Sequence, residues 1–540
     1  MEVILAIIAI YLLYLLITKI IIPVVAAVGE VAVIIISAIG GIMGLGYAIS
    51  NYCKAVKDNL NFKNWTWTKS SEPAKRSYFF GPGYAQLFGT IRSAFKYNAE
   101  SGRQVVDTFK KIKGDSDGLW GMVRGAAGIL YMIVAVVFIY VAGTILCAVF
   151  GIIHFSITAI FMVLIYILFS ITWIIDRAFL LKNKIRSYCP VCFEKSLIPV
   201  YKCPACGAAH RKLVPSVNGI WHHKCLCGQK LPCTFLNGRG KIEAHCPHCD
   251  AVLVSSSSRQ IAIQLIGGSS SGKTVYLSSF YHQFFDKVNQ GGKITAEIDE
   301  AFQPYFEELE RWYMGDECPA TAQLSAQMYP VLLSTPSGVS RQFNIYDIAG
   351  EMFDGYTADQ QILQKHFTYC DGMLFMIDPF SSGNLRAQLN RSGADMSTFS
   401  TMPTETVATS FINYLVSINR IKTGKRCDIP LSVVITKADI REVKREIGPA
   451  KIAATMRNNP GLYADYSQAR DALSRLFLIN NGMSATVDNL EASFSNIHYF
   501  PVSSMGHEQN GSEYEPWGVT EPIDWILPIA DPQLSDSLFA

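Results

Sequence analysis

The sequence predicts an α/β domain with a mostly parallel sheet and helices on both faces, joined to α-helical transmembrane hairpins and small metal-binding ribbons. Three observations predict this: apolar strands that alternate with helical stretches after residue 257, two long apolar blocks before residue 177, and a cluster of cysteines between them. The expected segments are a first hairpin at 1–50, a basic segment at 51–125, a second hairpin at 126–176, tandem ribbons at 177–256 and the α/β domain at 257–540.

Both hairpin assignments rest on hydropathy. Residues 3–50 carry only two charged side chains, Lys19 and Glu30, and residues 126–175 carry none. Each block is too long for one straight crossing, which takes about 20 residues. We expect the first block to turn between residues 19 and 30, and the second at Gly151 and His154. This gives four crossings and makes the lipid bilayer a partner; a buried core helix is the alternative for any single segment.

The basic flanks predict the orientation. Residues 51–125 contain 13 Lys and Arg side chains, so the positive-inside rule places them, the N-terminus and everything after residue 176 in the cytoplasm of a multi-pass membrane protein. The start, Met1 and Glu2, lacks the basic region of a cleaved signal peptide, so the first helix should stay as an anchor. Residues 84–113 read as a basic amphipathic helix, which either lies on an anionic leaflet or packs on the protein itself. The net charge of +3 is too small to indicate nucleic-acid binding.

The cysteines predict zinc. Nine of the 14 lie between residues 189 and 249, mostly as pairs two or three positions apart, and two such pairs complete a tetrahedral Zn²⁺ site. Disulfides are the alternative, but the cytoplasmic placement disfavours them. We expect two closed, structural ions. The first predicted set is Cys189, Cys192, Cys203 and Cys206, and the second is Cys225, Cys227, Cys246 and Cys249, with Cys233, His222, His223, His245 or His248 as possible replacements in the second.

Residues 267–274 read GGSSSGKT, between the apolar run Ile261–Ile266 and the helix-compatible stretch Thr274–Phe285. Strand, glycine turn and helix start are the order that a triphosphate cradle needs, because backbone N–H groups and the helix N-terminus then face the phosphates. We expect Lys273 to neutralise the outer phosphates and Thr274 to bind Mg²⁺. A chance match in a serine-rich linker is the alternative. The predicted nucleotide-binding residues here are Gly267, Gly268, Ser269, Ser270, Ser271, Gly272, Lys273, Thr274 and Val275.

Downstream strands end in further motifs. The strand in QFNIYDIAG, residues 342–350, ends in DxxG, where Asp347 is expected to hold Mg²⁺ through water and Gly350 to sense the third phosphate. The strand in LSVVITKAD, residues 431–439, ends in TKxD. Asp439 can accept two hydrogen bonds from the edge of guanine while Lys437 lies along the base, whereas adenine offers a single donor.

A third strand, in IHYFPVSS, ends in Ser503 and Ser504, and we expect a backbone amide there to contact the guanine carbonyl. Serines at strand ends are also common without that role. Between Asp439 and Ser503, residues 439–457 and 466–478 read as additional helices. The excursion 381–405 begins as a polar loop. These insertions are either solvated decorations or surfaces for a partner or for self-association.

The ordered set GxxxxGKT, DxxG, TKxD and SS resembles the TRAFAC-class, Ras-like GTPases, and covers about residues 258–540. The resemblance implies a P-loop GTPase fold with GTP and Mg²⁺. Thr436 replaces the usual Asn of the base-reading motif, as in the dynamins, so we expect guanine specificity to survive. Glu351 stands where many members have a Gln that orients the attacking water, and its charge near the third phosphate is unfavourable. Slow hydrolysis without a partner is the expectation.

The resemblance also implies a threonine that closes over Mg²⁺. We expect this to be Thr321, before the strand Met328–Leu333, because Thr295 lies in a strand-like segment where an ordinary β-branched role is favoured. Lys273, Thr321 and Glu351 are therefore the predicted catalytic residues.

The order of segments also resembles the zinc-ribbon-bearing membrane GTPases of the prokaryotic double-GTPase type, which are proposed to serve conflict or defence systems. This implies a prokaryotic inner-membrane location. We expect a membrane-anchored switch that binds and hydrolyses GTP and relays its nucleotide state to the membrane segments or to a protein effector or activator. A dynamin-like remodelling GTPase is one alternative. A GTP-gated channel or transporter is another, although the apolar blocks lack the charged residues that mark an ion path.

Overall fold

The computed structural model describes the chain apart from residues 62–71, 114–117, 193, 319–326, 336–337, 349–366, 368, 392–398, 423, 508–510 and 540. Its internal contacts divide the chain into two compact units. The first comprises residues 1–175 and 214–234, and the second comprises residues 176–213 and 235–540.

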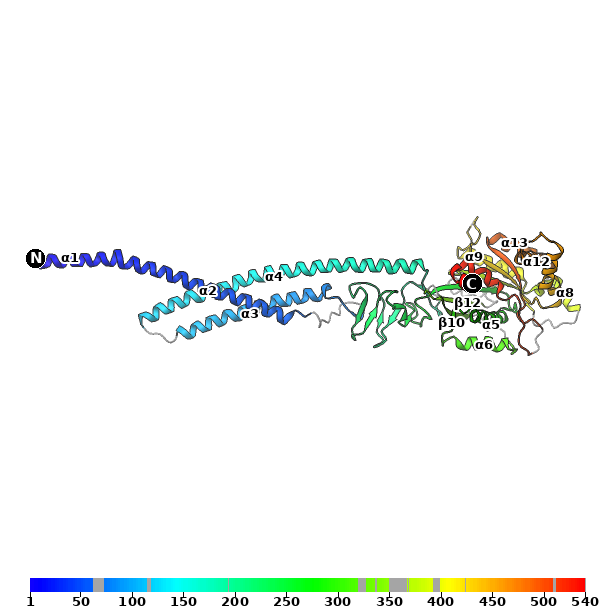
Figure 1. Ribbon diagram of the computed structural model, residues 1–540, viewed down its shortest axis with the longest axis horizontal. Helices are drawn as coiled ribbons and strands as arrows, with labels where there is room; N and C mark the ends of the chain where they lie inside the picture. Colours follow the sequence, from blue (N-terminus) through cyan, green and yellow to red (C-terminus); the bar gives the residue numbers. More distant parts are fainter. Residues whose placement is uncertain are drawn as a thin grey trace. The chain divides into compact units, whose positions relative to one another are not determined.

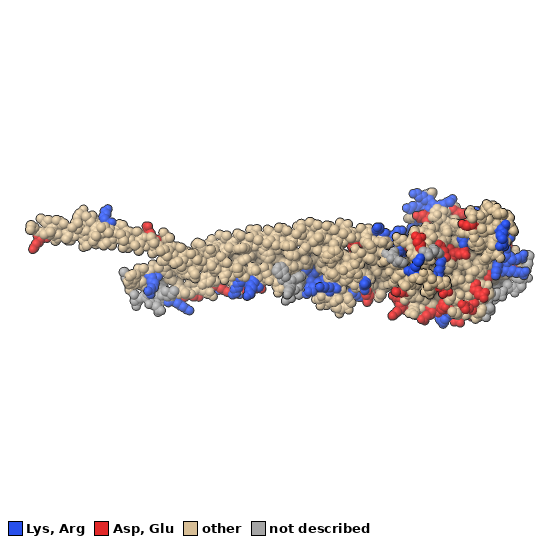
Figure 2. All heavy atoms as spheres, in the orientation of Figure 1, with Lys and Arg blue, Asp and Glu red and all other residues tan. Residues whose placement is uncertain are grey.

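Long helices dominate the first unit. Its elements are α1 (Glu2–Leu15), the π-helical η1 (Leu16–Ile21), α2 (Ile22–Asn59), β1 (Ala74–Lys75), the 3₁₀ turn η2 (Tyr78–Phe80), α3 (Pro82–Lys113), most of α4 (Leu119–Lys182), β6 (His222–Cys225) and β7 (Lys230–Pro232). The stretches Glu2–Asn59 and Trp120–Lys182 are long and apolar enough to cross a membrane, judged by length and composition. Charged side chains are sparse along α1 and α2 (Figure 2).

The predicted hairpin turns are absent from both apolar blocks. Helix continues through residues 19–30 as η1 and α2, and α4 is one helix of 64 residues that passes through Gly151 and His154. A glycine costs a helix only about 1 kcal/mol relative to alanine, whereas a turn within an apolar stretch would leave backbone groups without partners. The expectation of two hairpins is therefore wrong, and two continuous helices replace the four crossings as candidate spans.

Helix α3 packs on α2 and α4. Asn51 of α2 donates to Oδ1 of Asn98 at 3.0 Å and to Oγ of Ser101 at 2.9 Å. A Cβ on Gly143 of α4 would stand 2.3 Å from the amide nitrogen of Asn98, so α4 also approaches closely. The expected amphipathic helix therefore forms and uses one face for packing, while basic residues such as Lys96 stay exposed. Its contact with an anionic leaflet stays a prediction.

Short strands form the cysteine-rich part of the second unit. These are β2 (Ser187–Tyr188), β3 (Lys195–Ser196), β4 (Val200–Lys202), β5 (Ala209–His210) and β8 (Ala244–His245), with the 3₁₀ turn η3 (Arg239–Lys241). β2 pairs with β3, and β4 lies between β5 and β8, all antiparallel. In the first unit, β6 lies between β1 and β7.

A seven-stranded sheet forms the α/β domain in the order β10-β11-β12-β9-β13-β14-β15. The five strands from β12 to β15 in this order are parallel, and β10 and β11 extend the β12 edge antiparallel. The strands are β9 (Arg259–Gly267), β10 (Thr295–Glu297), β11 (Gln327–Ser334), β12 (Arg341–Asp347), β13 (Gly372–Ile377), β14 (Leu431–Ile435) and β15 (Ile497–Pro501). The mostly parallel sheet is confirmed.

Two hydrophobic cores cover the two faces of this sheet. Along β13, Phe375 belongs to one core and its neighbour Leu374 to the other, because successive strand residues point to opposite faces. Figure 1 shows α5 and α6 on one side, and α9, α12 and α13 on the other. The helices and turns are α5 (Lys273–Gly291), α6 (Gln303–Tyr313), η5 (Pro379–Ser381), α8 (Gly383–Arg391), α9 (Thr404–Ser417), α10 (Arg441–Ile447), α11 (Pro449–Asn458), α12 (Tyr466–Leu478), η6 (Ile479–Met483), α13 (Ser484–Ser493), α14 (Glu521–Ala530) and α15 (Pro532–Phe539).

The predicted insertions have a definite structure. The helix expected over residues 466–478 is α12, and the one expected over 439–457 forms as α10 and α11, which are separated at Gly448. The excursion 381–405 was expected to begin as a polar loop, but it is helical near its start, where α8 forms, and it leads into α9. Thr295 lies in a strand, as expected.

Candidate functional site

The phosphate loop lies between β9 and α5, at the carboxyl edge of the parallel strands. Gly272 at φ +86° and Ser270 at φ +58° turn the backbone through the left-handed region. The buried ammonium of Lys273 donates to the carbonyls of Gly267 at 3.1 Å and Gly268 at 3.0 Å, so the lysine curls over the loop. A cation held above a ring of backbone amides is suited to a polyphosphate.

Asp347 ends β12 beside this loop. Its Oδ2 accepts a hydrogen bond of 3.2 Å from the hydroxyl of Thr274, and its buried Oδ1 has no hydrogen-bond partner among the residues that the structure describes. Burial raises the pKa of the Asp347 carboxyl, an effect that Lys273 and the Thr274 hydroxyl offset in part. A buried, unsatisfied carboxylate oxygen next to a hydroxyl fits Mg²⁺, which prefers such oxygen ligands.

The predicted base-reading motif, TKxD, follows β14, which is the second strand from β9 on the side of β13. Lys437 has φ +55°, and its ammonium donates to the carbonyl of Ser270 at 3.2 Å. Oδ1 of Asp439 accepts from the hydroxyl of Ser503 at 3.0 Å, while the carbonyl of Ser504 accepts from Ser279 of α5 at 2.6 Å. The structure thus brings the ends of β14 and β15 to the same edge as the phosphate loop.

Thr436, directly after β14, makes a hydrogen bond to the neighbouring strand β13. Its buried hydroxyl donates to the carbonyl of Ile377 at 3.1 Å, and a Cβ on Gly272 would stand 3.8 Å from the Cβ of Thr436. The threonine therefore joins β14 to β13 behind the phosphate loop. Three further predicted site residues, Thr321, Gly350 and Glu351, lie outside the described residues.

Asp378 directly follows β13 and is a site residue that none of the sequence motifs indicated. Its carboxylate accepts the ammonium of Lys437 at 2.7 Å and has no exposed surface. An acidic residue after the buried run GMLFMI was the available signal, because ligands of open parallel sheets bind beyond the carboxyl ends of the strands.

A protein-family model, Double-GTPase 1, matches residues 264–526. Residues 264–526 form a double-GTPase domain. The domain is therefore a P-loop GTPase, for which GTP and Mg²⁺ are the implied ligands. No curated protein matches the chain.

Solved GTPase structures also resemble parts of the chain. The Arl6 (BBS3) small GTPase from Trypanosoma brucei, with the bound nucleotide analogue GppNp, is 14% identical, with a TM-score of 0.22, over 51% of this chain and 99% of its own. LeoA, a bacterial dynamin GTPase from ETEC, is 16% identical, with a TM-score of 0.22, over 52% of this chain and 35% of its own.

Four cysteines gather beside the double-GTPase domain, in a set that differs from the predicted one. The Sγ atoms of the four lie within 4.8 Å of one another. Sγ of Cys189 is 3.4 Å from that of Cys249, and Sγ of Cys192 is 3.6 Å from that of Cys246. Four thiolates at such distances fit one tetrahedral Zn²⁺. We call this set the cysteine tetrad: Cys189, Cys192, Cys246 and Cys249.

Both predicted zinc sets are therefore wrong in their pairing. The pairs join because β4 pairs with β8, which aligns Val200 with His245, next to Cys246. Cys203 and Cys206 lie in the turn after β4, outside the tetrad. Cys225 ends β6 and Cys227 lies in the β6–β7 turn, both in the first unit. A second zinc ion stays a prediction.

Three of the alternative ligands predicted for the second zinc site, His245, His223 and Cys233, contact other groups of the protein. His245 contacts Glu243 at 2.6 Å and the carbonyl of Asp250 at 2.8 Å, and Nε2 of His223 lies 2.8 Å from the carbonyl of Val214. The thiol of Cys233 donates to the carbonyl of Ile220 at 3.0 Å. None of these three belongs to the tetrad.

The cysteine tetrad is packed on the sheet of the double-GTPase domain through Tyr188, which precedes Cys189. Its buried ring lies 6.0 Å, centroid to centroid, from Tyr346 and 6.2 Å from Tyr369. Tyr346 directly precedes Asp347 on β12. A side chain next to a tetrad ligand thus touches the strand that presents the proposed Mg²⁺ ligand.

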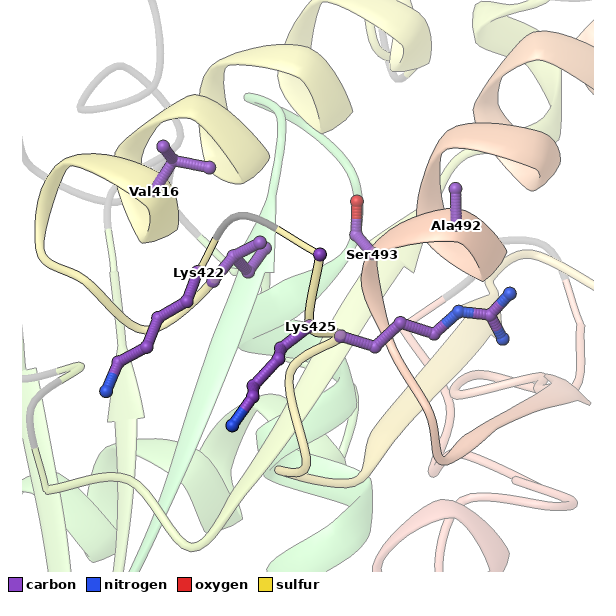
Figure 3. Close-up of a pocket in the computed structure, with 8 residues that line it drawn as sticks. Val416, Lys422, Lys425, Ala492 and Ser493 are labelled. Carbon is purple, nitrogen blue, oxygen red and sulfur yellow. The ribbon is translucent and has the colours of Figure 1, made fainter.

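A hollow of about 490 Å³ lies away from the phosphate loop, on the side of α9 and α13 (Figure 3). Lys422, Lys425 and Arg426 line it, next to Val416 near the end of α9 and Ser493 at the end of α13. Cations at helix C-termini offset the negative end of the helix dipole.

Proposed function

We propose that the chain is a membrane-anchored guanine-nucleotide switch whose cysteine tetrad relays the nucleotide state. The observation that carries the proposal is the meeting of four motifs at the carboxyl edge of one sheet: the phosphate loop after β9, Asp347 on β12, Asp439 after β14 and Ser503 after β15. A matched phosphate cradle and base reader at one edge is what recognition of a whole nucleotide requires.

Each residue has a role in this proposal. Lys273 binds the outer phosphates, while Thr274 and Asp347 hold Mg²⁺, directly or through water. When bound, Mg²⁺ would neutralise charge on the phosphates. Lys437 and Asp439 select guanine, with a backbone amide at Ser503 or Ser504 on its carbonyl. Thr321, Gly350 and Glu351 would respond to the third phosphate, and Glu351 in place of Gln makes hydrolysis slow without a partner.

The base-reading assignment predicts a change of specificity. Replacing Asp439 with Asn should lower the affinity for GTP by roughly 10- to 100-fold, since hydrogen bonds to a charged group are lost. The variant should instead favour xanthosine triphosphate, whose carbonyl replaces the amino group. Competition binding with both nucleotides measures this. Unchanged preference for GTP would show that Asp439 does not read the base.

The relay is supported by contacts within the second unit. Tyr188 connects the cysteine tetrad to β12, as described above. Near the end of α4, the buried Asp176 accepts Nη1 of Arg239 at 3.0 Å and the backbone N–H of Phe235 at 2.7 Å. The C-terminal part of α4 is thus tied to residues 235–239, which belong to the same unit as the cysteine tetrad. We infer that hydrolysis alters these contacts and that an effector or activator, or a second copy, responds to them.

The proposal that the chain is anchored in a membrane rests on the apolar helices α1–α2 and α4. We also propose that the double-GTPase domain lies on the cytoplasmic side of a prokaryotic inner membrane and that the chain has a role in defence. An alkaline wash of membranes should leave the full chain in the pellet, because apolar helices resist extraction that removes peripheral proteins. Immunoblotting of pellet and supernatant checks this, with detergent release as the control. Recovery in the alkaline supernatant would contradict integral anchoring.

A further inference from the structure

Asp378 is a buried carboxylate that joins three parts of the nucleotide site. Its Oδ2 accepts the ammonium of Lys437 at 2.7 Å and the backbone N–H of Ser400 at 2.8 Å. Its Oδ1 accepts the N–H of Phe380 at 2.9 Å. The side chain has no exposed surface, so water does not screen these bonds.

Lys437 is fixed by what surrounds its ammonium. Besides Asp378, the ammonium donates to the carbonyl of Ser270 in the phosphate loop and lies 4.6 Å from the centroid of the Phe399 ring. A lysine side chain is otherwise free about four bonds, and ordering it on binding weakens affinity. The paired carboxylate therefore holds Lys437 ready for the base before the nucleotide arrives.

The same carboxylate oxygen anchors the end of the 381–405 excursion. Ser400 lies against the phosphate loop, since a Cβ on Gly268 would stand 3.3 Å from its Oγ and 3.5 Å from Cβ of Met402. Arg386 of α8 donates to the carbonyl of Ser400 at 3.0 Å, and the hydroxyls of Ser381 and Thr404 lie 2.6 Å apart. The described ends of the excursion thus contact each other, and Ser400 supports the back of the phosphate loop.

We propose that Asp378 is a positioning residue for guanine-nucleotide binding, which fixes Lys437 against the phosphate loop and couples that contact to the excursion through Ser400. The inference rests on the proposed guanine-nucleotide site. It assigns the excursion a structural part in nucleotide affinity, in addition to any partner that it binds.

The test compares Asp378→Asn with Asp371→Asn in the full chain. Asp371 is a matched control, because it is a partly buried aspartate that directly precedes the same strand and accepts the N–H of Ala262 at 3.0 Å. It lies at the end of β13 opposite to the phosphate loop. Asp378→Asn should raise the dissociation constants of GTP and GDP by the same factor of about ten, as expected when one partner of a buried charged hydrogen bond is lost. Asp371→Asn should leave both unchanged.

A double-mutant cycle with Lys437→Met separates positioning from general stability. If Asp378 acts through Lys437, Asp378→Asn should add less than about twofold to the dissociation constant in the Lys437→Met background. Additive effects, or an effect equal to that of Asp371→Asn, would overturn the proposal. Failure of the wild-type chain to bind GTP would instead refute the proposed function.

Hydrogen exchange in the wild-type chain gives a readout that needs no substituted protein. GTP should slow exchange of the Ser400 amide, because the nucleotide stabilises Lys437 and the carboxylate that both groups share. If the Asp378→Asn variant does not fold, an unchanged Ser400 exchange rate on GTP binding would overturn the proposal by itself.

Discussion

Replacing Lys273 with alanine is expected to lower the affinity for GTP by more than about 100-fold, because the buried ammonium is lost and the negative charge of the GTP phosphates is no longer neutralised. The fold should survive. The core around β9 and α5 is built from apolar side chains such as Leu265, Tyr276 and Phe280, none of which depends on the lysine. Fluorescence titration with a labelled GTP analogue measures the affinity, and thermal unfolding checks the fold.

Lys293→Ala is the matched control for this variant. Lys293 is exposed, lies just after α5 and carries the same charge, so its loss should change neither affinity nor unfolding temperature beyond measurement error. Tight GTP binding by the Lys273 variant would mean that the GGSSSGKT loop does not cradle the phosphates. A fall in affinity of both variants would point instead to the net charge of the domain.

The sheet and its motifs were predictable because local and long-range signals agree. The runs before Gly267 and Thr436 are mainly apolar over the length of a strand, and the run before Asp347 alternates polar and apolar residues. Each run ends in residues whose chemistry needs the carboxyl edge of a parallel sheet. Helix α12 was predictable from its amphipathic spacing alone. Such elements are determined by short segments of sequence.

Asp378 could not be found in this way. Its role depends on the left-handed backbone of Lys437, 59 positions later, which turns the ammonium back toward β13. The prediction of hairpin turns in the two apolar blocks was wrong for a related reason. Gly151 and His154 look like turn residues, but whether a turn forms depends on the medium around the helix, and an apolar medium favours continuous backbone hydrogen bonds.

The zinc ligand sets were also not predictable from short segments of sequence, because CxxC pairs look alike and their spacing does not show which two pairs share one ion. Pairing by nearest neighbours joined Cys189 with Cys203, yet the pairing of β4 with β8 brings Cys246 to the first pair across more than 50 positions. Spacing identifies the ligands of a metal site, whereas the sheet decides which of them meet.

Zinc stoichiometry should therefore distinguish the two pairings. In the cysteine tetrad, Cys189 and Cys246 belong to one site, so Cys189→Ser, Cys246→Ser and the double variant should each lose one and the same zinc ion per chain. The sequential pairing places these two cysteines in different sites, and the double variant would then lose two ions. Metal analysis of purified protein gives the count, with Cys53→Ser, an exposed cysteine of α2, as the control.

Loss of this zinc ion should also change the affinity of the nucleotide site for GTP. A structural zinc contributes about 10–16 kcal/mol of apparent binding free energy to the segment that it holds, so Tyr188 should lose its fixed place against Tyr346 when a ligand is removed. We expect the dissociation constant of GTP to change by roughly fivefold or more, the usual lower range of coupling between two sites. By reciprocity, GTP should change the affinity for zinc by the same factor. Equal GTP affinity in the Cys189→Ser variant and the wild-type chain would mean that the tetrad only stabilises its own segment and does not relay the nucleotide state.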